Sequence, residues 1–265
     1  MVAITRAVSP ALARCELSGG PRVPIDVGRA VEQHAGYERA LEGLGCSIER
    51  LPASAEMPDC VFVEDTAVVL DEVAVIARPG AASRRPETAA VDAALARHRP
   101  VVRIEAPATL DGGDVLTVGR LIFVGRSRRT NDDAAAQLRT LTAGFGYVVR
   151  QVSVEGCLHL KSAVTAVGDR TLLVNREWVH PGDFAGFELL EVAPGEAAAA
   201  NIVQVGKSLL CAAAYPRTLE RLERRGFRVT AVDVSEIAKA DGAVTCCSLV
   251  FNAGRDAKDF GPPAR

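Results

Sequence analysis

The chain has 265 residues, of which 48% are hydrophobic but only 5% aromatic, so its core must be built from alanine, valine and leucine. A formal net charge of −2 argues against a protein that binds nucleic acid through bulk positive charge. No segment approaches the roughly 18 apolar residues that cross a bilayer, and the first residues lack the apolar stretch of a signal peptide.

Seven cysteines are present, an odd number with no CxxC pair. This pattern favours reduced thiols over a disulfide framework, and we expect a cytoplasmic protein.

The first elements predicted in chain order are a strand at 2–7, a helix at 27–44 and a strand at 47–51. Four hairpins follow, each formed by two β-branched or apolar runs around a short polar turn. They are predicted at 60–70 with 73–77, 115–118 with 121–124, 162–167 with 171–175, and 202–205 with 208–213. Their recurrence about every 40–50 residues indicates an internal repeat.

Helices follow most of these hairpins. We predict them at 86–97, 131–143 and 216–225, and the second opens with Asn-Asp-Asp, a good N-terminal cap. Short strands such as 147–152 and 228–232 come next. The final run, 247–251, lacks a hairpin partner, so we predict that it pairs with the first strand and closes a ring. The sequence therefore predicts one α/β domain, 1–265, of about five strand–strand–helix–strand units.

An acidic cluster opens the first hairpin, where Asp59, Glu64 and Asp65 flank an apolar run. Buried carboxylates are costly unless they are paired. The cluster is therefore either a solvated strand entrance or a pocket for a guanidinium or ammonium group, whose N–H donors carboxylates accept in pairs.

A second acidic motif places Asp111 and Asp114 on either side of a Gly-Gly pair. Such a sequence is common in simple turns. It is also typical of a backbone that must approach a ligand closely. The sequence alone leaves both interpretations open.

Among the four histidines, His159 is the best candidate for acid–base chemistry, because it lies at the predicted entrance of a strand. His34 and His98 fall on predicted helices, where we expect them at the surface, and His180 precedes a Pro-Gly loop.

Two adjacent cysteines, Cys246 and Cys247, lie between a glycine turn and an apolar run. On a strand their side chains would point to opposite faces, one toward a site and one toward the core. Together with Cys157 and His159 they match no common zinc spacing, so we expect no metal and no cofactor.

As an ordered set, these motifs resemble the dimethylarginine dimethylaminohydrolase family of the guanidino-group-modifying (pentein) superfamily, over nearly the whole chain. The matching segments are DCVFVED at 59–65, RPGAASRR at 78–85, LDGGDV at 110–115, RRTN at 128–131, LHLKS at 158–162 and DGAVTCCS at 241–248. The resemblance implies a five-bladed α/β propeller of ββαβ units, and hydrolysis of methylated arginines to citrulline and a methylamine through a covalent thiouronium on cysteine.

Site residues follow from the same resemblance. It implies Cys246 as nucleophile, His159 as acid and then base, and Asp111 as the third member that orients the histidine. The implied substrate contacts are Leu17, Asp59 and Ala240 for the α-amino group, Phe62, Glu64 and Asp65 around the guanidinium, and Arg84 and Arg129 for the α-carboxylate. Residues 176–200 match no motif of the family.

Three other functions remain open at this level. One is an arginine deiminase-like hydrolase that releases ammonia, and another is a non-catalytic protein that binds arginine analogues. The third is a thiol-based metal sensor. In each enzymatic case the partner is a small molecule rather than nucleic acid or membrane, and a homodimer is compatible with the sequence.

Overall fold

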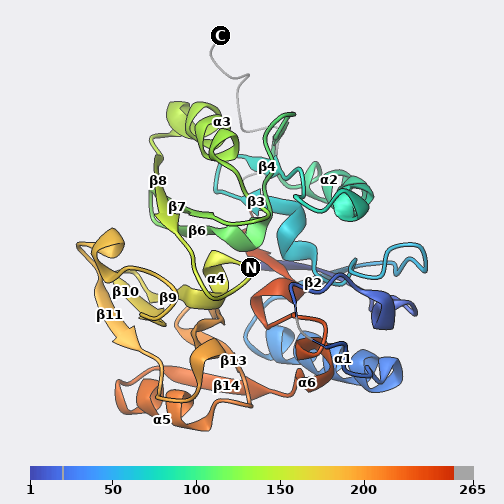
Figure 1. Ribbon diagram of the computed structural model, residues 1–265, viewed down its shortest axis with the longest axis vertical. Coiled ribbons are helices and arrows are strands. Elements are labelled where there is room, and N and C mark those ends of the chain that lie inside the picture. Colours follow the sequence, from blue (N-terminus) through green and yellow to red (C-terminus); the bar gives the residue numbers. More distant parts are fainter. Residues whose placement is uncertain (20, 254–265) are drawn as a thin grey trace.

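Five three-stranded sheets surround a common centre in the computed structural model, which describes residues 1–19 and 21–253 (Figure 1). In every sheet the middle strand pairs antiparallel with one neighbour and parallel with the other. This is the pairing of the predicted ββαβ unit, repeated five times. The five-bladed α/β propeller expected from the sequence is therefore confirmed.

The first blade is built from both ends of the described chain. Strand β1 (Val2–Arg6) pairs in parallel with β2 (Ser47–Leu51), and α1 (Val27–Gly43) connects them. On its other side β1 pairs antiparallel with β15 (Leu249–Phe251), with Ala3 opposite Val250. The ring closure predicted for the last strand is thus correct.

The other four blades follow in chain order. The second contains β3 (Ala67–Val69), β4 (Ala74–Ile76), α2 (Thr88–Leu95) and β5 (Val101–Arg103), and the third contains β6 (Val115–Val118), β7 (Leu121–Arg126), α3 (Asp132–Thr142) and β8 (Val148–Ser153). The fourth contains β9 (Val164–Gly168), β10 (Thr171–Val174) and β11 (Glu188–Glu191), and the fifth β12 (Ile202–Val205), β13 (Ser208–Ala212), α5 (Pro216–Arg224) and β14 (Arg228–Val232).

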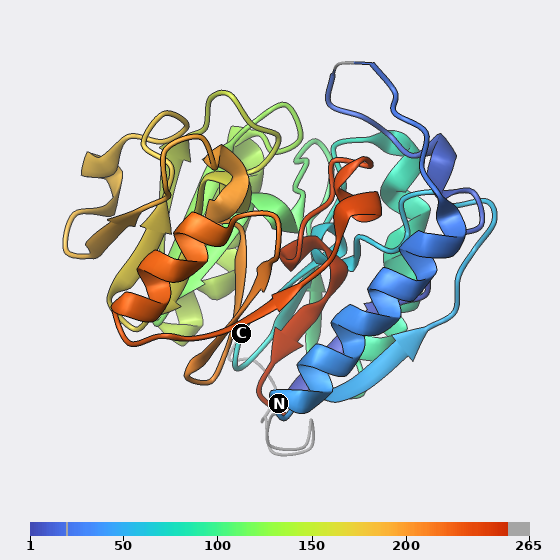
Figure 2. The ribbon, with the colours of Figure 1, turned by 90° about the horizontal axis from the view of Figure 1, so that it is seen from below.

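The longer helices α1, α2, α3 and α5 lie at the periphery, while β3, β6 and the short α4 (Leu160–Ala163) lie nearer the centre (Figure 1). Figure 2 shows α1 along one flank. Local sequence explains the helix starts: the Asn131 side chain accepts from the Ala134 N–H and caps α3. Within the described chain, no helix combines the length and apolarity that a membrane crossing requires.

Two predicted strand segments are instead turns. Residues Val63–Thr66 form a 3-10 helix before β3, and Thr245–Cys247 form another before β15. In the first, Glu64 and Asp65 are both buried and have partners in different directions, which a compact turn allows. The Thr66 hydroxyl donates to the Val63 carbonyl and closes that turn.

The fourth blade departs most from the prediction. The segment expected to begin a strand at 162 starts as the short helix α4, and β9 begins only at Val164. The connection from β10 to β11 carries a 3-10 helix, Pro181–Phe184, in place of an α-helix. Strand β11, within the segment 176–200 that matched nothing, was not predicted.

Candidate active site

Most of the predicted site residues line one small cavity, although they come from segments far apart in the chain. Its wall contains Asp59, Phe62, Asp65, Arg84, Arg129, His159, Ala240 and Cys246, all of which the sequence had marked. Glu16, Leu158, Asp241 and Gly242 also line it, and sequence reasoning missed them. Three predicted residues, Leu17, Glu64 and Asp111, do not belong to this wall.

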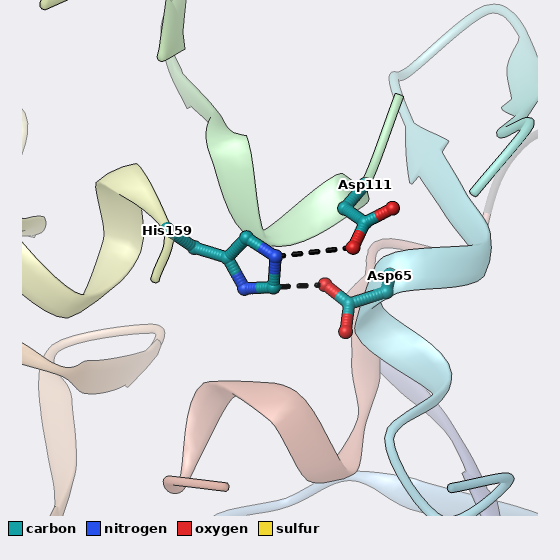
Figure 3. A group of neighbouring side chains, drawn as sticks. All are labelled: Asp65, Asp111 and His159. Carbon is teal, nitrogen blue, oxygen red and sulfur yellow. Dashed lines mark hydrogen bonds and ion pairs between the residues drawn. The ribbon is translucent and has the colours of Figure 1, made fainter. Parts of the chain in front are cut away.

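His159 lies between two carboxylates that come from two other segments (Figure 3). Its Nε2 is 3.1 Å from Asp111 Oδ2, and its Nδ1 is 3.7 Å from Asp65 Oδ1. All three side chains are buried. Asp111 therefore lies behind the imidazole, where it can orient the ring.

This arrangement controls the charge of the imidazole. Burial opposes the protonated form of His159, but the carboxylates of Asp65, Asp111 and Asp114 outweigh it and raise the pKa to about 9. At neutral pH the ring is therefore an imidazolium, which can donate a proton.

The Gly-Gly pair makes this geometry possible. A Cβ on Gly113 would lie 2.6 Å from His159 Nδ1 and 2.8 Å from Asp65 Oδ1, too close for any side chain. The Gly113 N–H donates to Asp65 Oδ1 over 3.0 Å. Asp114, fully buried, accepts from the Leu160 N–H next to His159 over 2.9 Å. The glycines of this motif thus allow a close approach, to the side chains of His159 and Asp65, and Asp114, marked in the sequence only as part of the motif, holds the backbone next to His159.

We expect an NMR titration of the His159 imidazole to give a pKa about 9, and Gly113→Ala to lower it toward the ordinary value of about 6.5. The added methyl must displace the ring from its carboxylates. Gly144→Ala is the matched control, because a Cβ there meets no atom within 4 Å. A wild-type midpoint near 6.5, or no change in Gly113→Ala, would contradict the geometry.

Asp65 is held as an anion. Burial opposes its charge, but His159, Arg84 and the Gly113 N–H outweigh that cost and lower its pKa to about 2. Arg84 Nη1 donates to Asp65 Oδ2 over 2.6 Å, and Arg84 also pairs with Glu87 over 2.9 Å. Arg84 therefore holds Asp65 in place, and its hydrogen bonds within the described chain leave one Nη1 N–H for a ligand.

Arg129 makes fewer contacts with carboxylates than Arg84 does. Its side chain is 15% exposed, and Nη1 lies 4.0 Å from Asp111 Oδ2. Within the described chain, Nη1 is buried and has no hydrogen-bond partner. A buried guanidinium N–H without a partner is costly, so this position favours an anionic ligand.

The two cysteines have different surroundings. Cys246 lines the cavity, whereas Cys247 is fully buried in the core beside Tyr37 and Val244. The separation matches the prediction, but its cause is the 3-10 geometry of Thr245–Cys247, in which successive side chains point in different directions, rather than strand alternation. Burial and the charges of Glu64 and Asp65 raise the pKa of Cys246 well above its usual range.

Glu64 points away from the cavity. Its Oε1 is 2.6 Å from Lys161 Nζ, and its Oε2 accepts from the Thr245 hydroxyl over 2.7 Å. These three residues line a second cavity of about 460 Å³, which has no cysteine in its wall. Glu64 therefore lines the second cavity, whereas its neighbour Asp65 lines the first.

The segments 15–19 and 21–26 project from the body at the end opposite the N-terminus (Figure 2). Here the Glu16 N–H donates to both oxygens of Asp59 over 3.1 Å, and the Ser18 N–H donates to Asp241 over 2.6 Å. Leu17 lies between these contacts and packs against the core. The cavity itself measures about 20 Å³, which is less than the volume of an amino acid.

Asp65, Asp111 and His159 could also be considered as metal ligands, since three of their donor atoms lie within 4.8 Å of one another. A metal there would have to displace the proton that the carboxylates hold on His159 up to about pH 9, so protonation and metal binding compete at this position.

The fold and the central polar site define a five-bladed α/β propeller with a buried acid–base centre. No protein-family model matches the chain. Solved structures of arginine dihydrolase ArgZ from cyanobacteria share this fold with a TM-score of 0.81 at 18% identity, over 94% of this chain and 96% of theirs.

More similar proteins define the family. The chain is 42% identical to N(G),N(G)-dimethylarginine dimethylaminohydrolase of Streptomyces coelicolor over 93% of this chain and 95% of the relative, and 40% identical to the enzyme of that name from Pseudomonas aeruginosa over 85% and 90%. A structure of the Pseudomonas protein as a cysteine-to-serine variant complexed with citrulline has a TM-score of 0.89 at 36% identity, over 94% of this chain and 98% of that one. The chain belongs to the dimethylarginine dimethylaminohydrolase family.

Proposed function

We propose that this protein hydrolyses Nω,Nω-dimethyl-L-arginine and Nω-monomethyl-L-arginine to L-citrulline and the corresponding methylamine. The observation that carries the proposal is one cavity that holds the Cys246 thiol, the protonated His159 and the anionic Asp65. A thiol, an acid and a carboxylate are the groups needed to attack a guanidinium carbon and release an amine.

In the first step, Asp65 binds the guanidinium and orients it toward Cys246. Without a ligand the thiol stays protonated, because burial and the two carboxylates raise its pKa. A bound cation beside the sulfur favours the thiolate, and the thiol proton passes to solvent. The thiolate sulfur then attacks the guanidinium carbon, so the substrate's own charge activates the nucleophile.

In the second step, His159 donates its proton to the departing amine nitrogen, and the C–N bond breaks to leave a thiouronium on Cys246. The neutral imidazole, still oriented by Asp111, then takes a proton from the attacking water. Collapse of this second adduct expels the Cys246 thiolate and forms citrulline. His159 ends the cycle protonated, as it began.

The two ends of the amino acid need opposite charges from the protein. Asp59, with the backbone near Leu17 and Ala240, is placed to receive the α-amino group once the Glu16 N–H leaves its carboxylate. Arg129 is the better candidate for the α-carboxylate, with the remaining N–H of Arg84 beside it.

Phe62 contributes an aromatic ring to the wall of the cavity. A Cβ on Gly242 would lie 2.3 Å from the Phe62 ring, so the ring packs directly against the turn that leads to Cys246. We assign Phe62 to the apolar wall around the substrate.

The test is to incubate the protein with dimethylarginine, monomethylarginine and arginine in turn, and to measure citrulline together with dimethylamine, methylamine or ammonia. We expect citrulline and the methylated amine from the first two. Citrulline with ammonia from arginine alone would identify a deiminase, and binding of these ligands without any citrulline would identify a non-catalytic binding protein.

Three further features belong to the proposal. We treat 1–265 as one catalytic domain, because the cavity wall draws on several blades. We place it in the cytoplasm, because all seven cysteines are free and the proposed nucleophile must stay reduced. A homodimer stays a prediction that sedimentation analysis would test.

A further inference from the structure

A closed ring of polar contacts links four residues behind the cavity wall, three through their side chains and Lys161 through both its side chain and its backbone carbonyl. Lys161 pairs with Glu64, Glu64 accepts from the Thr245 hydroxyl, and Asn201 bridges Thr245 back to the Lys161 carbonyl. The distances are 2.6, 2.7, 2.9 and 3.0 Å, respectively, for Lys161–Glu64, Thr245–Glu64, Asn201–Thr245 and Asn201–Lys161. The members come from four separate segments of the chain.

Asn201 is the member with the most connections. Its Nδ2 donates both to the Lys161 carbonyl and to Thr245 Oγ1, while its Oδ1 accepts from the Thr245 N–H over 2.9 Å. The side chain is buried and all of its donors are used. Its hydrogen bonds thus tie the α4 turn to the Thr245–Cys247 turn.

The ring adjoins three groups of the cavity. Thr245 immediately precedes Cys246, Glu64 immediately precedes Asp65, and Lys161 is two residues beyond His159. Any shift of a ring member therefore moves a neighbouring group in the cavity. Misplacement of reacting groups by about 1 Å can slow an enzyme on the order of 100-fold.

We propose that Asn201 is a positioning residue, which sets the distance between the nucleophile turn of Cys246 and the acid–base turn of His159 by holding Thr245 and Lys161 together. The proposal rests on the function given above. Asn201 does not line the cavity that contains the thiol, so it acts through the two turns.

Charge supports the same assignment. Burial, and after it the negative charge of Glu64, raises the pKa of the Cys246 thiol. Lys161 neutralises Glu64 at 2.6 Å and stays in place partly because Asn201 holds its backbone. Without the Asn201 side chain the Thr245–Cys247 turn loses two hydrogen bonds, so the Cys246 sulfur becomes more accessible to a reagent in solution.

The experiment compares Asn201→Ala with Asn175→Ala. Asn175 is an ideal control: like Asn201 it is 4% exposed, and its side chain also donates to a backbone carbonyl, that of Ala197, and accepts from a backbone N–H, that of Glu177. We expect Asn201→Ala to lower kcat on the order of 100-fold with KM changed much less. Asn175→Ala is expected to lower the melting temperature while kcat stays close to that of the wild type.

A second measurement needs no substrate. We expect the rate of Cys246 alkylation by iodoacetamide at pH 9, followed by peptide mass spectrometry, to rise in Asn201→Ala, because the loosened Thr245–Cys247 turn exposes the buried sulfur to the reagent. If Asn201→Ala fails to fold, Thr245→Val, which removes only the bridging hydroxyl, must show both effects.

The outcomes separate the two proposals. Wild-type protein that makes no citrulline overturns the proposed function, and the alkylation series then decides the role of Asn201 alone. An unchanged alkylation rate in Asn201→Ala, or equal losses of kcat in Asn201→Ala and Asn175→Ala, would mean that Asn201 only stabilises the fold.

Discussion

Replacement of Cys246 by serine is expected to abolish turnover of methylated arginines, with kcat lower by roughly 10⁴-fold or more, as for other nucleophile knockouts. The hydroxyl of serine does not ionise beside a bound cation as a thiol does, so no thiouronium forms. Binding should persist, because Asp65 and Arg129 are unchanged. Citrulline release measures the loss, and mass spectrometry of the wild-type protein should detect the covalent adduct that the variant lacks.

Cys247→Ser is the matched control one residue along. Cys247 is fully buried in the core, and its Sγ donates to the Ala243 carbonyl over 3.5 Å. A buried hydroxyl costs about 1–3 kcal/mol of stability, so we expect a lower melting temperature with most of the activity kept. The reverse pattern, an inactive Cys247→Ser and an active Cys246→Ser, would assign the chemistry to the other sulfur.

His159→Gln is expected to lower kcat by roughly 10²–10⁴-fold, the usual contribution of a general acid. Glutamine fills the space between Asp65 and Asp111 but cannot transfer a proton. In the wild type, kcat/KM, which reports the free enzyme, should fall as pH rises through about 9 and His159 loses its proton. The variant should lose that falling limb, and pH profiles of citrulline formation would reveal the difference.

The same titration affects stability with a definite sign. Folding raises the His159 pKa from 6.5 to about 9, so its stabilisation is fully present below pH 6.5 and is lost as pH rises through about 9. The melting temperature of the wild type should therefore fall more steeply than that of His159→Gln between neutral pH and pH 9. His98→Gln is the control, because His98 pairs with Glu49 outside the cavity. Parallel melting curves for His159→Gln and the wild type would contradict the raised pKa.

Local signals in the sequence were sufficient for most of the fold. Hairpin turns, the Asn131 cap and the recurrence of β-branched runs each depend on neighbouring residues, and these elements were correctly placed. Even the pairing of β15 with β1, the longest-range contact predicted, followed from counting: one strand lacked a partner in an otherwise regular repeat.

Contacts between blades were harder to predict. Nothing local distinguishes Glu64 from Asp65, and only the partners Lys161 and His159, which lie outside their own blade, separate their directions. His34 was expected at the surface, yet it is buried near Glu38 on the inner side of α1. Burial, with a smaller contribution from the charge of Arg50, lowers the pKa of His34 to about 4, so it stays neutral there.

Strand β11 escaped detection for a different reason. Its sequence, Glu-Leu-Leu-Glu, lacks the β-branched and aromatic residues typical of strands, and the parallel pairing with β10 supplies what intrinsic preference does not. The connection from β10 to β11 contains a short 3-10 helix in place of an α-helix, so the helix that precedes the last strand in the other blades was missing as a signal. Sequence pattern fails where a tertiary partner decides the structure.

The pairing of β15 with β1 also has a consequence for the newly made protein. A ribosome produces the five blades from the N-terminus, and the proposed nucleophile, Cys246, immediately precedes the strand that completes the first blade. A chain that ends before residue 246 therefore lacks both the proposed nucleophile and the strand that completes the first blade.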